Sequence, residues 1–526
     1  MRDFQAVGRS VVMAQNGMCA TSHPLAAQTA ISILQAGGNA VDAGVAAAMV
    51  LNICEPQMTG LGGDCFALLR PAGADHIIGL NASGRAPASA NAAALRAAGR
   101  TVLAPSDVDA VTMPGAVDGM VRLVEDHGSM ELAQILAPAI RYAEEGIPVA
   151  PRVAFDWVEA ADNLHGHART LYLKNGKPLR IGDIFRAPGQ ANVLREIAKH
   201  GRAGFYEGEV AEDLINSLAG LGGGHSHDDL ARVCMDYISP VSTTYRGREL
   251  LELPPNGQGV TALLLANILG HFDFEGMDPV GAARTHILAE AGKLAYDARN
   301  RFVADPTFMG EALAHLTAPE TATKLAQLIS PKAVLPLPSE ALENVHKDTV
   351  NLSVVDKDGM ALSLIYSIFN AFGSGHASQK FGILFHNRGS GFSLSEGHPN
   401  EFGPGKRPMH TIIPAMLRDG GNLMPFSVMG GQYQAAGHVF FMSNLVDYGM
   451  DMQAAINAPR SFAEKDALWL ETGVTPEVAQ DLADLGHNIA WRKGPIGGAQ
   501  AIQIDAARGI LIGASDPRKD GCALGY

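Results

Sequence analysis

Hydrophobic and polar residues alternate most clearly in two runs that follow residue 349. The run VNLSVVD comes directly after Thr349, and MALSLIYSIF begins at Met360, with a Lys-Asp-Gly turn between them. A period of two with many β-branched residues favours strands, and a short turn that contains glycine joins antiparallel strands. The sequence therefore predicts a β-hairpin with Thr349 directly before its first strand.

Helical patterns are typical of the first third of the chain. Pro24 and Leu25 open an expected helix that ends at Gly37 and Gly38, and the Ala-rich segment 40–52 is an expected helix suited to close packing. A Gly-rich turn at 59–63 leads into a short apolar strand at 65–69. Further helices are expected at 115–145, 190–220, 281–301, 438–457 and 475–486, and further strands near 500–505 and 509–513.

Composition limits the classes of function. Hydrophobic residues make up 47% of the 526 residues, charged residues make up 18%, and the net charge is −14. A chain of this kind buries a large core, and its negative charge argues against nucleic acid as a partner. It holds no Lys/Arg run and no stretch of 18 apolar residues, so neither a membrane patch nor a membrane span is expected.

Five cysteines are scattered along the chain without a metal-ligand spacing. Their odd number and separation predict reduced, mostly buried thiols and no metal site, with one disulfide left open as the alternative. The N-terminal segment has no apolar region of a secretory signal, and a cytoplasmic location is the default expectation. The cysteines are Cys19, Cys54, Cys65, Cys234 and Cys522.

Thr349 offers a specific chemistry. A threonine hydroxyl becomes a good nucleophile at a chain N-terminus, where its own α-amine takes the proton. Such a residue needs a cut before it and a strand after it. The segment 330–348 is proline-containing and charged, so we expect an exposed loop there, and a strand follows Thr349. The alternative is that Thr349 simply begins a strand, where β-branched residues are common.

The motifs around this threonine favour the first interpretation. DTVNLSVVDKDG at 348–359 resembles the processing site of the gamma-glutamyltransferase family of N-terminal nucleophile hydrolases, and the resemblance covers essentially the whole chain. It is also carried, in the same order, by GGNAVDA within 22–47, TGLGGDCF at 59–66, PPNGQG at 254–259, GPGKRPMHTIIPAM at 403–416, VMGGQYQ at 428–434 and GASDPRKDGCALGY at 513–526.

The resemblance implies an α/β fold, a four-layer αββα sandwich built from one precursor. The chain would cut itself between Asp348 and Thr349 into a large fragment, 1–348, and a small fragment, 349–526. The fragments would stay together as a heterodimer, and further dimerisation is left open. Thr349 would be the nucleophile, with its freed amine as base and no cofactor or metal. Gly430 and Gly431 match the oxyanion-hole pair, Ser367 matches a hydroxyl that bonds the nucleophile, and Ser353 matches a supporting serine.

Several positions depart from the family pattern for a free amino acid head group. Ser83 takes the place of the arginine that binds the α-carboxylate, with Arg85 two residues later. Gly391 takes the place of the aspartate that binds the α-ammonium, and Arg388 is a new positive charge nearby. His410 and Thr411 replace a serine pair, and Phe369 replaces a substrate-contacting asparagine, with Asn370 beside it.

These changes remove a carboxylate and keep or add cationic side chains, which suits an anion and not an ammonium group. We therefore expect an amidohydrolase for a small amide with a nearby carboxylate, such as oxamate, with Arg85, Asn370, Arg388, His410 and Thr411 as candidate substrate-binding residues. The alternatives are a glutaryl acylase of the cephalosporin type, a glutathione hydrolase with glutamyl transferase activity, and an unprocessed relative that only binds a ligand. The sequence leaves the acyl group, the acceptor and the arginine that binds the carboxylate open.

Overall fold

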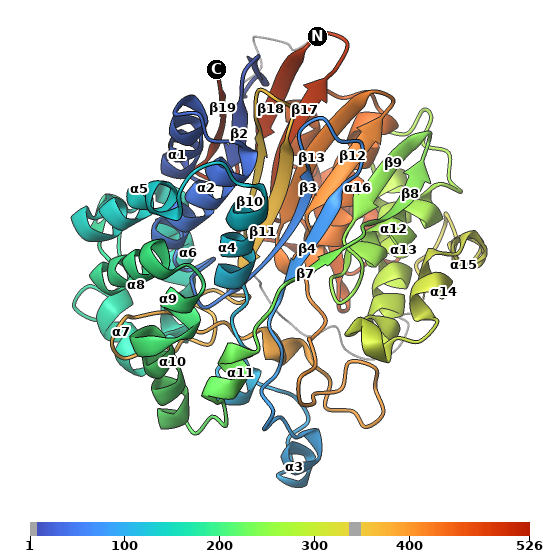
Figure 1. The fold of residues 1–526 in the computed structure, drawn as a ribbon. Coiled ribbons are helices and arrows are strands. Elements are labelled where there is room, and N and C mark those ends of the chain that lie inside the picture. The colour runs from blue at the N-terminus through green and yellow to red at the C-terminus, as the bar shows by residue number, and fades with distance from the viewer. Residues whose placement is uncertain (1–7, 336–348) are drawn as a thin grey trace.

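Two seven-stranded antiparallel sheets form the centre of the computed structural model, which describes residues 8–335 and 349–526 (Figure 1). The first sheet contains, in spatial order, β1 (Val12–Ala14), β18 (Ile510–Ser515), β17 (Gly498–Asp505), β13 (Asn422–Met429), β12 (Ala415–Asp419), β9 (Arg248–Glu252) and β8 (Val241–Tyr245). The second contains β19 (Cys522–Gly525), β2 (Met18–Thr21), β10 (Val350–Val355), β11 (Ala361–Ser367), β3 (Asp64–Arg70), β4 (Ile78–Ala82) and β7 (Asp236–Ile238).

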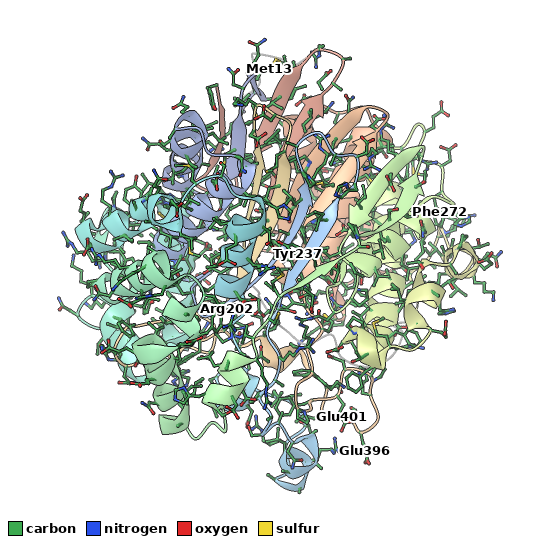
Figure 2. All side chains as sticks on the ribbon, in the orientation of Figure 1. Met13, Arg202, Tyr237, Phe272, Glu396 and Glu401 are labelled. Atoms are coloured by element: carbon green, nitrogen blue, oxygen red, sulfur yellow. The ribbon has the colours of Figure 1, made fainter. Side chains whose placement is uncertain are left out.

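Helices cover the outer face of each sheet. The second sheet is covered by α1 (Pro24–Gln35), α2 (Ala40–Cys54) and α4 (Ala116–His127), while α5 (Leu132–Glu145) packs on α2 and α8 (Pro188–His200) packs on α5. The first sheet is covered by α12 (Gly259–Leu269), α16 (Gln434–Val446) and α17 (Met452–Asn457), and α13 (Ala282–Phe302) packs on α12. The expected four-layer αββα sandwich is therefore the observed architecture, and Figure 2 shows side chains filling the space between its layers.

Smaller elements complete the described chain. The remaining helices are α3 (Ala92–Ala97), α6 (Pro151–Ala160), α7 (Gly166–Tyr172), α9 (Ala203–Tyr206), α10 (Gly208–Gly220), α11 (His227–Ala231), α14 (Ala312–Thr317), α15 (Pro319–Ala326) and α18 (Pro476–Asp484). The short strands are β5 (Ile147–Pro148), β6 (Ile184–Phe185), β14 (Ser461–Glu464), β15 (Ala467–Leu470) and β16 (Ile489–Trp491). Within residues 8–335 and 349–526, no helix has the length and apolar character that crossing a membrane requires.

The predicted hairpin is confirmed as β10 and β11, and every residue in both strands is buried. Apolar side chains such as Leu352 and Leu364 pack against the helical layer. On the other face, polar side chains bond the opposite sheet: Asn351 Nδ2 donates to the carbonyl of Ser427 at 2.6 Å, and Ser363 Oγ donates to that of Phe426 at 2.9 Å. These bonds hold the two sheets in register beside Thr349.

Helix boundaries were predicted less well than helix positions. The single helix expected at 438–457 is wrong, because α16 ends at Val446 and α17 begins at Met452, with the side chain of Asp451 capping the second helix and Gly449 at a φ of 59° between them. The expected helical regions 115–145 and 190–220 are likewise divided, into α4 and α5 and into α8, α9 and α10. All five cysteines are free thiols, and three of them are buried.

Candidate active site

Three neighbouring strands bring three polar side chains to one end of the second sheet. Ser353 pairs with Ser363 across β10 and β11, and continuing that register places Thr349 opposite Ser367. Ser367 in turn pairs with Asp64 at the start of β3. Side chains at alternate positions of a strand share a face, so all three point between the sheets. The hydroxyl of Thr349 donates to Ser367 Oγ at 3.4 Å, and Thr349 is buried.

Arg388 extends this row of polar groups. It lies in a short 3₁₀ segment, Arg388–Gly391, and is fully buried. Its Nη2 donates to Ser367 Oγ at 3.3 Å and its Nη1 to Thr411 Oγ1 at 2.8 Å, while Nε has no hydrogen-bond partner in residues 8–335 and 349–526. Burial lowers the pKa of Arg388 to about 9, against the opposing effect of Asp64, so the guanidinium is charged at neutral pH.

The ring of Phe369 packs against the guanidinium of Arg388. Its ring centroid lies 3.8 Å from Arg388 Cζ, a cation–π contact, and its backbone N–H donates to Ser367 Oγ at 2.8 Å. The φ of Phe369 is 81°, which is rare for a bulky residue and is typical of functional sites that hold strained backbone. Asn370, the neighbouring candidate, is partly buried, and its backbone N–H donates to Asn387 Oδ1 at 3.1 Å.

Asp64 is the anion that balances this cluster, and sequence reasoning did not single it out. Its Oδ1 accepts hydrogen bonds from the amides of Gly84 at 2.9 Å and Gly115 at 3.2 Å, and its Oδ2 lies 3.0 Å from His410 Nε2 and 3.5 Å from His386 Nδ1. Burial would raise its pKa, but the two histidines and the arginine next to them lower it to about 2. The carboxylate is therefore ionised throughout the physiological range.

His410 already uses both ring nitrogens inside the protein. The amide of Ile412 donates to Nδ1 at 3.4 Å, so Nε2 carries the proton that is given to Asp64. Burial and the nearby Arg388 lower the pKa of His410 to about 3, which keeps the imidazole neutral at pH 7. A direct substrate contact by His410 stays a prediction and would require one of these bonds to be exchanged.

The remaining predicted residues lie at different distances from Thr349. Arg85 is in the loop after β4, pairs with Asp305 at 3.2 Å and does not line the pocket at Thr349. Ser353 is four residues along β10, about 13 Å from Thr349 at the usual rise of a strand, so it belongs to the scaffold. Asp348, and with it the proposed cleavage site, lies outside the described residues.

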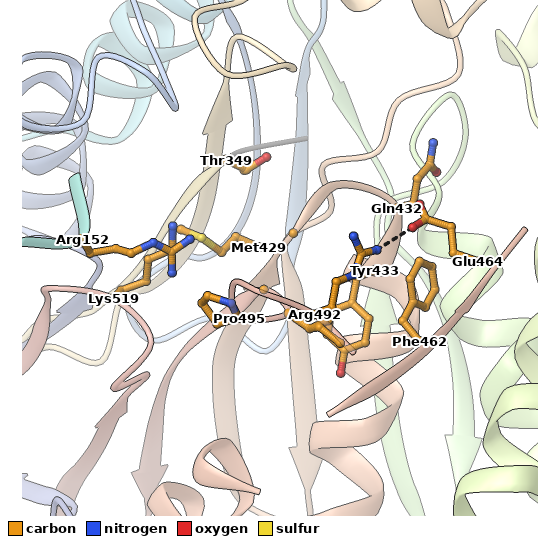
Figure 3. Close-up of a pocket in the computed structure, with 13 residues that line it drawn as sticks. Arg152, Thr349, Met429, Gln432, Tyr433, Phe462, Glu464, Arg492, Pro495 and Lys519 are labelled. Carbon is orange, nitrogen blue, oxygen red and sulfur yellow. Dashed lines mark hydrogen bonds and ion pairs between the residues drawn. The ribbon is translucent and has the colours of Figure 1, made fainter. Parts of the chain in front are cut away.

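Thr349 also borders an open pocket (Figure 3). Gly430, with a φ of 132°, follows the end of β13 and lines the same pocket, and Gly431 begins the next 3₁₀ turn with its carbonyl held by Gln258 at 3.0 Å. The other lining residues are Arg152, Met429, Gln432, Tyr433, Phe462, Glu464, Arg492, Pro495, Ile496, Gly497 and Lys519. The C-terminal motif therefore contributes a wall of the pocket through Lys519.

Comparison with known proteins now connects this geometry to a family. A profile of the family described as Gamma-glutamyltranspeptidase matches residues 26–526. The chain belongs to the gamma-glutamyltranspeptidase family. The expected family resemblance is thereby confirmed over nearly the whole chain.

Two curated relatives in the gamma-glutamyltranspeptidase family match this chain over nearly its whole length. It is 34% identical to the Glutathione hydrolase-like YwrD proenzyme of Bacillus subtilis (strain 168), over 98% of this chain and 99% of that protein. It is also 34% identical to the Oxamate amidohydrolase proenzyme of Klebsiella pneumoniae, over 97% of this chain and 98% of that protein. Both names describe precursors, which is consistent with a family of self-processing enzymes.

A solved structure supports the fold at the same level. The cephalosporin acylase from Bacillus halodurans superposes with a TM-score of 0.92 at 38% identity, over 100% of this chain and 99% of that chain. The expected αββα fold of the N-terminal nucleophile hydrolase type is confirmed for this gamma-glutamyltranspeptidase family member. The relatives carry three different substrate names, so the substrate has to be argued from the site.

Proposed function

We propose that this chain is a self-processing amidohydrolase that cleaves a small amide bearing a nearby carboxylate, such as oxamate, through an acyl-enzyme on Thr349. The observation that carries the proposal is the row of Thr349, Ser367 and Arg388, in which a hydroxyl lies 3.4 Å from a serine that is itself 3.3 Å from a buried guanidinium. A nucleophile and a fixed positive charge within one hydrogen-bond chain suit an anionic acyl group.

The proposed maturation consumes one water molecule. Thr349 Oγ attacks the carbonyl carbon of Asp348, the C–N bond of that peptide breaks, and the nitrogen takes the hydroxyl proton. Water then hydrolyses the resulting ester, leaving a carboxylate on Asp348 and a free α-amine on Thr349. The products are the large fragment, 1–348, and the small fragment, 349–526, which the shared sheets would keep together as a heterodimer.

In turnover, the α-amine of Thr349 would act as the general base for its own hydroxyl. The hydroxyl oxygen attacks the substrate amide, the amine or ammonia leaves with the proton, and water releases the acid. We assign the oxyanion to the amides of Gly430 and Gly431, which is supported by the position of Gly430 beside Thr349 in the pocket. No described residue accepts a hydrogen bond from either amide N–H.

Arg388 is the proposed carboxylate site, and it favours a small acyl group. The guanidinium is fully enclosed and does not line the open pocket, so a long dicarboxylate chain would need more room beside Ser367 than a two-carbon oxo-acid. Its unpartnered Nε leaves a hydrogen-bond donor for the substrate. Glutaryl amides remain the second candidate class, because a cephalosporin acylase superposes over the whole chain.

The assay of this proposal compares three substrate classes on the purified, processed enzyme. We expect ammonia release from oxamate, or amine release from glutaryl amides, and little or no signal from a γ-glutamyl anilide, because Gly391 offers no carboxylate to an ammonium group. Clear hydrolysis of glutathione without turnover of either acidic amide would overturn the proposal in favour of a conventional glutathione hydrolase.

The oxyanion assignment predicts a loss in kcat at Gly430. A Cβ added there would lie 2.9 Å from Gly497 Cα, and the φ of 132° disfavours alanine, so Gly430→Ala should displace the amide. We expect kcat to fall by about 10²-fold with little change in KM, near the effect of removing one oxyanion donor. The control is Gly420→Ala, with a φ of 58° and open space around it, which should leave kcat unchanged. Equal kcat values for both variants would contradict the assignment.

A further inference from the structure

A second cluster of ligand-type side chains lies outside the candidate active site, and none of its residues lines the pocket at Thr349. It consists of His286, Glu290 and His487, which are all buried and whose nearest ligand atoms lie within 4.8 Å of one another. His286 and Glu290 are one turn apart on α13, so their side chains share a face of that helix. His487 follows α18, about two hundred residues later, which explains why ligand spacing in the sequence predicted no metal site.

The imidazole of His286 is already oriented as that of a metal-bound histidine usually is. His286 Nε2 lies 2.7 Å from the carbonyl of Ser330, which can only accept, so Nε2 carries the proton and Nδ1 has the lone pair. That lone pair accepts a hydrogen bond from His487 Nε2–H, 2.8 Å away. A cation between the two rings would take the place of this proton, and the neutral His487 would then carry its proton on Nδ1. A ring whose second nitrogen is bonded to a backbone carbonyl is the common outer-shell arrangement of a metal-bound histidine.

The carboxylate of Glu290 completes the set. Its Oε1 accepts from Lys293 Nζ at 2.6 Å and its Oε2 from the amide of Leu335 at 2.5 Å, and each oxygen keeps a second lone pair. Lys293 is the cation that neutralises Glu290 in the described structure, and its side chain is 14% exposed, whereas that of Glu290 is 0% exposed. An arriving dication would therefore compete with Lys293 for this carboxylate.

We propose that His286, Glu290 and His487 form a binding site for a divalent transition cation of the zinc type. Two histidines and one glutamate are a known zinc donor set that leaves a fourth position for solvent. Nitrogen atoms at roughly 2.0–2.1 Å from a tetrahedral zinc are about 3.3 Å apart, so the two rings need to separate by only about 0.5 Å.

The site would join parts of the chain that the proposed maturation separates, and this consequence rests on the proposed cut before Thr349. His286 and Glu290 would belong to the large fragment and His487 to the small fragment. His286 also bonds the carbonyl of Ser330, and Glu290 bonds the amide of Leu335, the last residue of the described range 8–335. A bound cation would therefore fasten the two fragments to each other near the end of the large one.

Zinc binding itself tests the site, with readouts that do not depend on catalysis. The full-length protein is stripped with a chelator, equilibrated with Zn²⁺, and analysed for metal content and Tm. We expect wild type to retain about one equivalent more zinc than His487→Ala and to gain Tm on zinc addition, as a ligand that binds the native state should. His165→Ala is the matched control, because His165 faces His376 outside the cluster and should leave zinc binding unchanged.

Two further variants keep the outcome clear if His487→Ala folds poorly. Glu290→Gln should weaken zinc binding at least tenfold, whereas Lys293→Met should strengthen it by removing the competing ammonium. If the cluster were purely structural, Lys293→Met would lower the Tm and would not raise the affinity for zinc. Equal zinc content and an equal Tm response in wild type, His487→Ala and Glu290→Gln overturn the proposal. The uncut Thr349→Ala chain should bind zinc as wild type does, so failure of the cut and failure of the metal site are distinguishable.

Discussion

Thr349→Ala is expected to remain a single chain of 526 residues on a denaturing gel and to show no amidase activity. The variant removes the hydroxyl that lies 3.4 Å from Ser367 Oγ, and with it both the attack on Asp348 and the acyl-enzyme. The loss should reach about 10⁴-fold or more in kcat, the scale on which removal of a nucleophile acts in serine hydrolases. The fold should survive, because the variant loses only two side-chain heavy atoms, at a buried position before β10.

Thr349→Ser is the matched control for this experiment. It keeps a hydroxyl at the same atom position and loses only the methyl group that restricts the side-chain rotamer. We expect processing that is slower but complete, followed by reduced but measurable turnover. Cleavage of Thr349→Ala into residues 1–348 and 349–526, or turnover by the alanine variant, would show that another residue is the nucleophile.

Local pattern sufficed for the elements that carry the nucleophile. Alternation over 350–355 and 361–367, together with the turn between the two runs and their β-branched residues, identified the hairpin. These signals remain readable although both strands are buried on both faces. The Gly-rich turn before β3 was found for a similar reason. Glycines at 62 and 63 have Cβ positions that would lie within 2.5 Å of backbone oxygens, so the sequence there records a close approach.

The contacts that define the charge of the site were not available from local pattern. Asp64 and His410 are separated by 346 residues and meet only because β3 and the segment before β12 face each other across the sandwich. Arg85 and Arg388 looked equivalent as cations in the sequence. The loop after β4 turns Arg85 toward Asp305, whereas Arg388 is enclosed against Phe369 and Ser367. The different surroundings of the two arginines in the folded chain therefore come from tertiary structure and could not be predicted from residue type.

That difference makes Arg388→Met the second decisive variant. If the guanidinium binds the substrate carboxylate, its loss should lower kcat/KM for oxamate by about 10²–10³-fold, equivalent to roughly 3–4 kcal/mol for a buried charge pair. Pyruvamide replaces the carboxylate of oxamate by an acetyl group and should lose far less. The ratio of the two kcat/KM values isolates the charge from any general effect on the site.

Three further measurements distinguish carboxylate binding by Arg388 from a purely structural role of this residue. Arg85→Gln, which removes a half-exposed guanidinium paired with Asp305, should leave the oxamate-to-pyruvamide ratio unchanged. Arg388→Lys keeps the charge without the planar fork and should restore part of the activity toward oxamate. Self-cleavage of Arg388→Met on a denaturing gel would report that its fold is intact. Equal losses for oxamate and pyruvamide in Arg388→Met would mean that Arg388 only positions Ser367 and Thr411. Another cation would then have to bind the carboxylate. If that cation is Arg85, the oxamate-to-pyruvamide ratio should change in Arg85→Gln instead.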